Sequence, residues 1–304
     1  MRAIICLFGI LANVINLIVF IRQGFKDTVN ISLFSLAISD IGSLLPMLWM
    51  SIGFNPFLVN AYLPFDLQDA LYLTSGWPHI CFARISGWIT ASIMLERCLC
   101  IAMPLKVKTM ITVKRTVIVL DSIYVAMIGA FLPVLYAIRL EPLYSPLKNE
   151  TKFRIVYIPN GLAIEGVLFL INAISQLTSF SAVIICTIIL VQNLISKSKW
   201  RKSTSSSGDH DSFSNRDKKV VKLVLFIAII FIVCFFPSAI NFIVSSFEPE
   251  FRSLGKYWDY LVLAWSFSSS LSATNSAVNI FVYYKMSSKY TQILDKMFLR
   301  GTEG

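Results

Sequence analysis

The sequence predicts an all-α membrane protein, a seven-transmembrane helix bundle with a short amphipathic eighth helix. Of its 304 residues, 56% are hydrophobic and only 14% are charged, whereas about a quarter of the residues in a soluble domain are charged. Several long stretches contain no charged residue: 3–21, 41–65, 166–196, 223–247 and 260–284. Because about 20 helical residues cross a bilayer core, these stretches together indicate a multi-pass protein.

Polar segments and segments that contain Pro or Gly separate the expected spans. We expect the spans at about 3–21, 28–53, 70–101, 112–138, 161–195, 218–246 and 258–284. They form one domain over 1–286. The first could be a signal peptide, but it is long for one and Arg22 and Lys26 follow it, which favours a span. Because the chain starts almost inside this span, we expect a natural N-terminal segment to be missing.

Residues 287–304 are expected to form the eighth helix and a short tail. The helix has an apolar face and charged edges, the pattern of a helix that lies on a membrane surface. The apolar face consists of Tyr290, Ile293, Leu294, Met297 and Phe298.

The net charge of +10 is distributed unevenly among the connections. With the N-terminus outside, the inner connections and tail hold 18 Lys and Arg residues and the outer loops hold 6. Cytoplasmic loops are rich in Lys and Arg, so we expect a plasma-membrane protein with an outer N-terminus and a cytoplasmic C-terminus. The glycosylation acceptor Asn149 then lies in an outer loop. The positive charge is thus explained by the membrane topology and by the anionic lipid of the inner leaflet. It does not indicate a nucleic-acid partner.

The six cysteines lie in or at the ends of apolar stretches, so we expect no structural disulfide. Cys98 and Cys100 have no His or second Cys pair near them, which argues against a metal site. With two His residues in the chain, no cluster of catalytic groups is evident, and we expect no enzymatic activity and no cofactor.

Ionisable residues inside the expected spans mark candidate functional positions, because a charge in hydrocarbon is costly. They include Asp40, Arg84 and the pair Glu96-Arg97. On an ideal helix, His79, Ser86 and Arg97 share one stripe, and Arg84 points about 140° away from Arg97. In the last span, Asn275, Ser276, Asn279 and Tyr283 form a second polar stripe. Any one of these residues could equally serve helix packing.

Five motifs occur in order along the spans: Gly9-x-x-x-Asn13, Leu36-Ala37-Ile38-Ser39-Asp40, Glu96-Arg97-Cys98 with Pro104-Leu105 after it, Phe231-x-x-Cys234-Phe235-Phe236-Pro237, and Asn279-Ile280-x-x-Tyr283. With them, nearly the whole chain resembles a rhodopsin-like (class A) G-protein-coupled receptor. The segments Gly76-Trp77-Pro78-His79 and Arg84-Ile85-Ser86 also resemble molluscan receptors described as chemosensory.

The resemblance implies roles for particular residues. The switch toward a heterotrimeric G protein comprises Glu96, Arg97, Asp217 and Tyr283, although Asp217 could be only a solvated charge. An allosteric sodium ion would bind at Asp40, Ser86, Asn275, Ser276 and Asn279. Asn13 and Pro237 would serve helix packing. A ligand pocket would be lined by His79, Arg84, Phe235, Phe242 and Trp265.

The sequence departs from the family pattern at three places. The position of the family's outer cysteine is Tyr72, and the loop 139–160 contains no Cys. Both disulfide partners are therefore absent, and the loop must be held in another way. Phe235 replaces a Trp, and Ile280 replaces a Pro, which puts the kink of the seventh span in doubt.

The expected function is a receptor that binds an extracellular ligand, either a chemosensory small molecule or a peptide, and activates a G protein by outward movement of the sixth span. His79 makes an amine salt bridge improbable, and Ala273 stands where opsins carry the retinal lysine. Arg84 would either attract an anionic ligand or pair internally, with Glu165 as a candidate partner; internal pairing is favoured. A neuropeptide receptor of the same family is an alternative. A transporter or channel is another, although the sequence shows no repeated half.

Overall fold

The computed structural model describes residues 1–59, 61–103, 107, 109–145, 150–204, 211–251 and 255–299. Seven long helices dominate this described part of the chain. They are α1 (Arg2–Gln23), α2 (Thr28–Gly53), α5 (Trp77–Ala102), α7 (Val113–Ala137), α8 (Gly161–Thr204), α9 (Asp211–Phe247) and α10 (Trp258–Met286). A final helix, α11 (Ser288–Leu299), follows α10.

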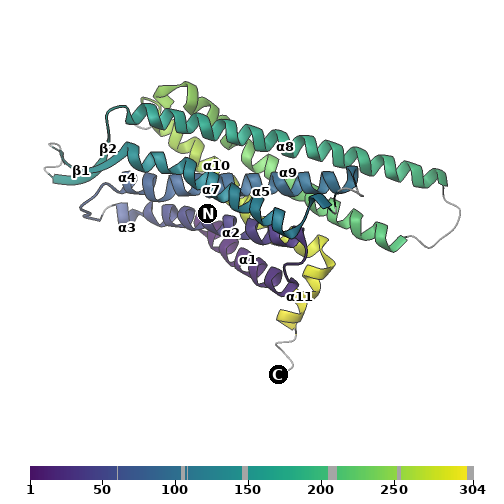
Figure 1. Ribbon diagram of the computed structural model, residues 1–304. Coiled ribbons are helices and arrows are strands. Elements are labelled where there is room, and N and C mark those ends of the chain that lie inside the picture. Colours follow the sequence, from purple (N-terminus) through teal and green to yellow (C-terminus); the bar gives the residue numbers. More distant parts are fainter. Residues whose placement is uncertain are drawn as a thin grey trace.

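The long helices pack into a closed bundle. Helix α1 packs on α2, α2 on α5, α5 on α8, α8 on α9, α9 on α10, and α10 returns to α1, while α7 covers α2, α5 and α8. Figure 1 shows two strands at one end of this bundle and α11 at the other. We call these the hairpin end and the α11 end. The expected seven-helix bundle with an eighth helix is confirmed.

Composition alone selects five of the seven helices as membrane spans. In the described residues, α1, α2, α7, the Gly161–Asn193 part of α8 and the Leu225–Phe247 part of α9 are long and apolar enough to cross a bilayer. Helices α5 and α10 are long enough but carry more polar residues, such as Arg84 and Glu96 on α5 and Ser268 and Ser272 on α10, all of them buried. Their polar side chains therefore lie inside the bundle, while large apolar side chains remain exposed around it, as on a surface that faces lipid.

The segment that the sequence presents only as a loop forms a β-hairpin. Strands β1 (Ile138–Ser145) and β2 (Glu150–Tyr157) pair in antiparallel fashion, with Ile138 opposite Tyr157. The amide of Phe153 donates to the carbonyl of Pro64 (2.9 Å), and the carbonyl of Phe153 accepts from the amide of Asp66 (2.9 Å). The hairpin is thus joined through its backbone to the segment that precedes the third span.

The third span begins with three consecutive helical pieces at the hairpin end. Asp66 caps α4 (Leu67–Leu71) by accepting hydrogen bonds from the amides of Gln68 and Asp69. The π-helical turn η1 (Tyr72–Gly76) follows and continues into α5. Such turns are rare and are often found at functional sites. Here the turn places Tyr72 on the wall of the pocket described below.

Close contacts join α1 to its neighbours. A Cβ atom at Gly9 would lie 2.8 Å from the Cδ1 atom of Leu44 and 3.1 Å from the Cβ atom of Ala277, so only glycine permits this approach of α1 to α2 and α10. One turn later, the Asn13 amide donates to the carbonyls of Gly9 (2.9 Å) and Ser276 (2.8 Å). The geometry of Asn13 is therefore that of a residue that holds α1 against α10.

Candidate functional site

A large pocket opens at the hairpin end between α1, α2, the start of the third span, and α10. It spans about 950 Å³, part of which is open to solvent. Its wall is mainly apolar and aromatic, with Trp77, Phe169, Trp258 and Trp265 among the lining residues. The pocket can therefore bury a ligand of low polarity.

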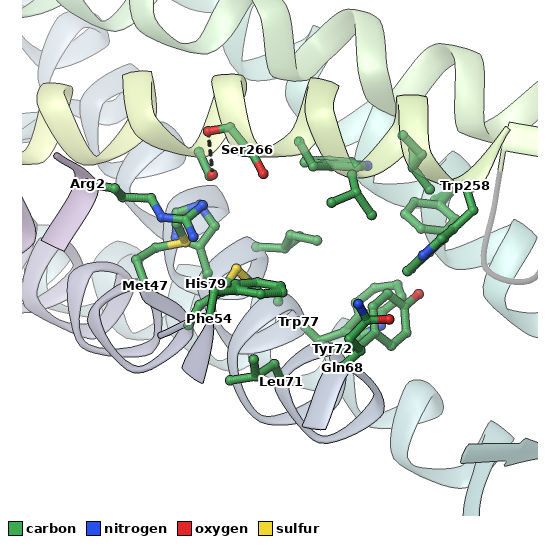
Figure 2. Close-up of a pocket in the computed structure, with 18 residues that line it drawn as sticks. Arg2, Met47, Phe54, Gln68, Leu71, Tyr72, Trp77, His79, Trp258 and Ser266 are labelled. Carbon is green, nitrogen blue, oxygen red and sulfur yellow. Dashed lines mark hydrogen bonds between the residues drawn. The ribbon is translucent and has the colours of Figure 1, made fainter. Parts of the chain in front are cut away.

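Figure 2 shows the polar groups of this pocket at its two ends. Arg2 and His79 lie at one end, and Gln68, Tyr72 and Trp258 lie at the other. Arg2 donates from Nε to the hydroxyl of Ser51 (3.1 Å). The Nδ1 atom of His79 lies 2.9 Å from the hydroxyl of Ser43. The imidazole is thus oriented by α2, the helix that also carries Asp40.

A smaller cavity continues from the pocket toward the interior of the bundle. It is narrow, with room for about one water molecule, and it shares His79, Ile80, Trp265 and Ser269 with the pocket. All five residues expected in the ligand pocket line this cavity: His79, Arg84, Phe235, Phe242 and Trp265. Their aromatic rings pack together, since the centroid of Phe242 lies 4.8 Å from that of Trp265.

Arg84 is buried among aromatic rings. Its guanidinium carbon lies 5.6 Å from the ring centroid of Phe235 and 5.2 Å from that of Phe242, both cation–π distances. Within the described residues no carboxylate forms an ion pair with it. Glu165 instead accepts hydrogen bonds from Tyr72 and Tyr157. The candidate pair of Arg84 and Glu165 is thus not among the ion pairs of the described residues.

The carboxylate of Asp40 is completely buried between α2, α5 and α10. Its Oδ1 atom accepts from the hydroxyls of Ser86 (3.0 Å) and Ser276 (2.9 Å), and its Oδ2 atom accepts from the amide of Asn279 (2.9 Å). Four of the five residues expected at the sodium site thus meet at one carboxylate. Asn275 is also buried, but it is absent from the hydrogen bonds that the structure records for Asp40.

The Glu96-Arg97 pair lies toward the α11 end. Arg97 Nη2 donates to Glu96 Oε1 at 2.7 Å, and the hydroxyl of Thr28 donates to the same oxygen. Tyr283 is buried elsewhere, with its ring centroid 5.4 Å from that of Phe20 and 5.7 Å from that of Tyr290. In this conformation Glu96 restrains Arg97, and Tyr283 packs against α1 and α11.

Three further residues named in the sequence analysis remain. One lies within α9, and the side chains of the other two are outside the described residues. Pro237 lies inside α9, two residues after Phe235. Asp217 lies in the first part of α9, but its side chain is outside the described residues. Asn149 is also outside them.

Sequence analysis missed the contacts that hold the hairpin. The hydroxyls of Tyr72 and Tyr157 both donate to Oε1 of Glu165, and the distance from the Tyr157 hydroxyl is 2.8 Å. We call these three residues the Tyr–Glu–Tyr bridge. A second contact joins β2 to α4, where Asp69 Oδ2 accepts from Arg154 (3.2 Å) and from the amide of Ile155 (3.0 Å). All six cysteines lie in described parts of the chain, and no disulfide joins any of them. The sequence signal was the tyrosine at the position of the family's outer cysteine.

The chain matches one known family over nearly its whole length. Residues 1–301 match the model of the serpentine type 7TM GPCR chemoreceptor Srw. The chain belongs to this family. The resemblance to rhodopsin-like receptors is thereby confirmed, and membership supports the chemosensory expectation. Together with the apolar helices, it makes the receptor a multi-pass membrane protein.

Individual relatives are distant but cover nearly the whole receptor. It is 25% identical to neuromedin-U receptor 2 of Homo sapiens, over 93% of this chain and 66% of the relative. It is 22% identical to neuropeptide receptor 22 of Caenorhabditis elegans, over 95% and 66% respectively. It is 23% identical to growth hormone secretagogue receptor type 1 of Sus scrofa, over 95% and 77%. The receptor thus spans slightly less than two thirds of the length of the first two relatives.

Proposed function

We propose that the receptor binds an extracellular ligand in the pocket at the hairpin end and activates a heterotrimeric G protein at the α11 end. The observation that carries this proposal is that the pocket and the cavity beside Phe235 share four lining residues. Phe235 belongs to α9, the helix whose movement would open the G-protein face. A ligand that extends from the pocket into this cavity would therefore contact α9, the helix that transmits the signal.

The aromatic packing around Phe235 supplies the transmission step. Its ring centroid lies 4.9 Å from that of Phe231, which in turn lies 5.3 Å from that of Phe180 on α8. A ligand that displaces Phe235 must repack these rings, because protein interiors are close-packed. The outward movement of α9, pivoting near Pro237, relieves this packing. At the other end, Arg97 leaves Glu96 and turns toward the G protein, with Asp217 as a second resting-state partner.

We propose that the hairpin end is extracellular and the α11 end cytoplasmic. The excess of Lys and Arg in the connections at the α11 end supports this orientation. It leaves Asn149 outside as a glycosylation site. Removal of N-linked glycans should then change the mobility of the receptor on a gel, and Asn149→Gln should abolish that change.

We propose further that the Asp40 cluster binds a sodium ion as an allosteric ligand. The residues fit a small monovalent cation, because one carboxylate is surrounded by the hydroxyls of Ser86 and Ser276 and the amide of Asn279. In the described part of the chain, no basic side chain pairs with Asp40. A buried carboxylate needs a counter-charge or a proton. A sodium ion at Asp40 would hold α2, α5 and α10 together in the resting state.

Nucleotide exchange on a G protein tests the proposal. Membranes that contain the full chain and a promiscuous G protein are screened with water-borne odorants and with neuropeptides. We expect at least one compound to accelerate exchange, and Arg97→Ala to abolish that response at equal surface expression. Tyr62→Phe is the control, since Tyr62 is 85% exposed. An agonist-independent ionic current with no exchange at any compound would identify a channel instead.

A peptide ligand is the second candidate. Two relatives are named as a neuromedin-U receptor and a neuropeptide receptor, which favours it. A peptide too large for the pocket would also touch the hairpin, where Leu140 and Leu143 are 54% and 45% exposed. The variant Leu140→Ser/Leu143→Ser should then weaken the response to a peptide but leave the response to a small molecule unchanged.

A further inference from the structure

The buried guanidinium of Arg84 forms no ion pair within the described residues. The residue is only 5% exposed and lines the smaller cavity, directly beneath the large pocket. Its Nε atom has no hydrogen-bond partner. The rings of Phe235 and Phe242 contact its face, but aromatic faces cannot accept the in-plane N–H groups of a guanidinium.

A second unpartnered polar atom faces the same cavity. The hydroxyl of Ser272 on α10 is buried and has no hydrogen-bond partner. Ser268, one turn earlier, accepts from the amide of Asn241 (2.9 Å), so its own hydroxyl hydrogen remains available to donate. Donors from α5 and α10 therefore surround one small space, which is the chemistry of an anion site.

The charges around the two cavities have one sign. Arg2, His79 and Arg84 are the ionisable side chains of basic type, and no Asp or Glu occurs among the described residues that line either cavity. The buried carboxylate of Glu165 on α8 accepts from Tyr72 and Tyr157 at Oε1 and lines neither cavity. A cationic ligand would find no counter-charge here, whereas an anionic group would find one.

We propose that Arg84 is the counter-ion for the carboxylate of an amphiphilic ligand, whose apolar part fills the large pocket. The carboxylate enters the smaller cavity as the rings of Phe235 and Phe242 shift outward, and it accepts from the Arg84 guanidinium and the Ser272 hydroxyl. The apolar part packs among Trp77, Phe169 and Trp265. This inference rests on the proposed function of the large pocket as the ligand site, and it specifies the chemical class of the ligand as an apolar monocarboxylic acid.

The position of Arg84 also explains how such a ligand would act. The guanidinium contacts Phe235 and Phe242, both on α9. An incoming carboxylate draws the guanidinium toward the smaller cavity and changes its contacts with both rings. Neutralisation of Arg84 and displacement of α9 are then one event, so that a neutral analogue of the same shape lacks the driving interaction.

Thermal unfolding of the purified full chain in nanodiscs tests the proposal. The probes are decanoate, a lipid-derived type of acid, and 3-phenylpropanoate, a water-soluble one, each compared with its primary amide and its amine. We expect at least one acid to raise the midpoint of unfolding, and its amide and amine to fail. In Arg84→Met, the half-maximal concentration of that acid should rise about 10- to 100-fold, as expected when a charged hydrogen bond is lost.

Matched variants separate binding from folding. Arg139→Met removes a guanidinium that is exposed at the same end of the molecule and should leave the response to the acid unchanged. The midpoint of Arg84→Met without ligand should equal or exceed that of the parent protein, because a buried unpaired charge is gone. A lower midpoint would show that Arg84 is structural and would overturn the proposal, as would amides that stabilise the receptor as well as the acids, or failure of both acids.

Nucleotide exchange distinguishes this proposal from the one on which it rests. If only amides, amines or peptides accelerate exchange, the receptor function stands and the assignment of Arg84 falls. If an acid stabilises the parent protein through Arg84 and no ligand accelerates exchange on any G protein, the carboxylate site stands and the proposed function falls.

Discussion

Tyr72 and Tyr157 donate hydrogen bonds to the same carboxylate oxygen, Oε1 of Glu165. Tyr72 begins the third span, and Tyr157 ends strand β2 of the hairpin. The bridge therefore joins the two elements that a disulfide joins in the family pattern. A carboxylate that accepts from two phenols is a strong but non-covalent link, so the hairpin is held without any oxidised cysteine.

Loss of one phenol of the bridge should destabilise the receptor. In Tyr72→Phe, the buried carboxylate of Glu165 loses a donor, which costs about 1–3 kcal/mol, and the midpoint of thermal unfolding falls. Tyr62→Phe, at an 85% exposed position, is the control. Glu165→Gln should lower the midpoint as well, and the double variant should be less destabilised than the sum of the two, because both single changes break one interaction. Additive effects would contradict the bridge.

Reducing agent should leave the stability of the receptor unchanged. No disulfide joins any of the six cysteines, all of which the structure describes, so reduction has no covalent link to cut. The measurement is the midpoint of thermal unfolding with and without dithiothreitol in membranes freshly prepared under alkylating conditions. A fall of the midpoint on reduction would mean that two of these thiols are oxidised in the cell.

The helices were predictable because lipid imposes long apolar stretches with few charges. The helical period further placed His79 and Ser86 on one stripe of the third span, and in the structure both contact α2, through Ser43 and Ser39. Arg84 lies on another face, against α9. The spacing of polar residues along a buried helix is thus enough to assign each of them to a face of that helix.

The hairpin and the partner of Arg84 could not be predicted in the same way. Strands β1 and β2 are short, Pro142 interrupts the first, and the long apolar spans dominate the pattern of the sequence. Glu165 was a candidate partner for Arg84 because residue spacing indicates the face of a helix on which a side chain lies. Spacing does not indicate whether Arg84 or a tyrosine hydroxyl contacts the Glu165 carboxylate. Tyr72 and Tyr157 are 93 and 8 residues from Glu165, and only the folded chain brings them together.

Removal of the charge at Glu96 should raise basal signalling. In Glu96→Gln, Arg97 loses its ion pair at 2.7 Å, and the resting position of its guanidinium is stabilised less. Basal nucleotide exchange in the absence of ligand should therefore increase several-fold, since about 1 kcal/mol shifts such an equilibrium about fivefold. Glu141→Gln, on strand β1, is the control for a charge removed far from this pair. Unchanged basal exchange would exclude Glu96 as a restraint on Arg97.

Asp217→Asn tests the second half of this restraint separately. If Asp217 also holds Arg97, basal exchange should rise, and the rise should not add fully to that of Glu96→Gln because both changes release one guanidinium. If Asp217 is a solvated charge, basal exchange in Asp217→Asn should equal that of the parent receptor.

Sodium should weaken the binding of agonists by acting at Asp40. The cluster of Asp40, Ser86, Ser276 and Asn279 supplies one negative charge and neutral oxygens to a small cation. Replacement of potassium by sodium at constant ionic strength should lower agonist affinity in the parent receptor and leave it unchanged in Asp40→Asn. The variant Asp259→Asn, at the first turn of α10, controls for loss of a charge elsewhere. Agonist affinity that does not respond to sodium in the parent receptor would refute the site.

The hydroxyl of Tyr290 connects α11 to the Asp40 cluster through α1. It donates to the Oδ1 atom of Asn16 (2.6 Å), Asn16 donates to Asn13 (3.2 Å), and Asn13 donates to the carbonyl of Ser276 (2.8 Å), whose hydroxyl reaches Asp40. Burial raises the pKa of the Tyr290 phenol, so the donor stays protonated throughout the neutral and mildly alkaline range.

Removal of this hydroxyl should loosen α11 without unfolding the bundle. In Tyr290→Phe, the ring still packs against Phe20 and Tyr283, but Asn16 loses a donor, at a cost of about 1 kcal/mol. Hydrogen exchange of the α11 amides should therefore accelerate about fivefold, while exchange in α2 and α5 stays unchanged. Tyr284→Phe, at a 47% exposed position one residue after Tyr283, is the matched control. Equal exchange of α11 in the parent receptor and in Tyr290→Phe would mean that ring packing alone docks this helix.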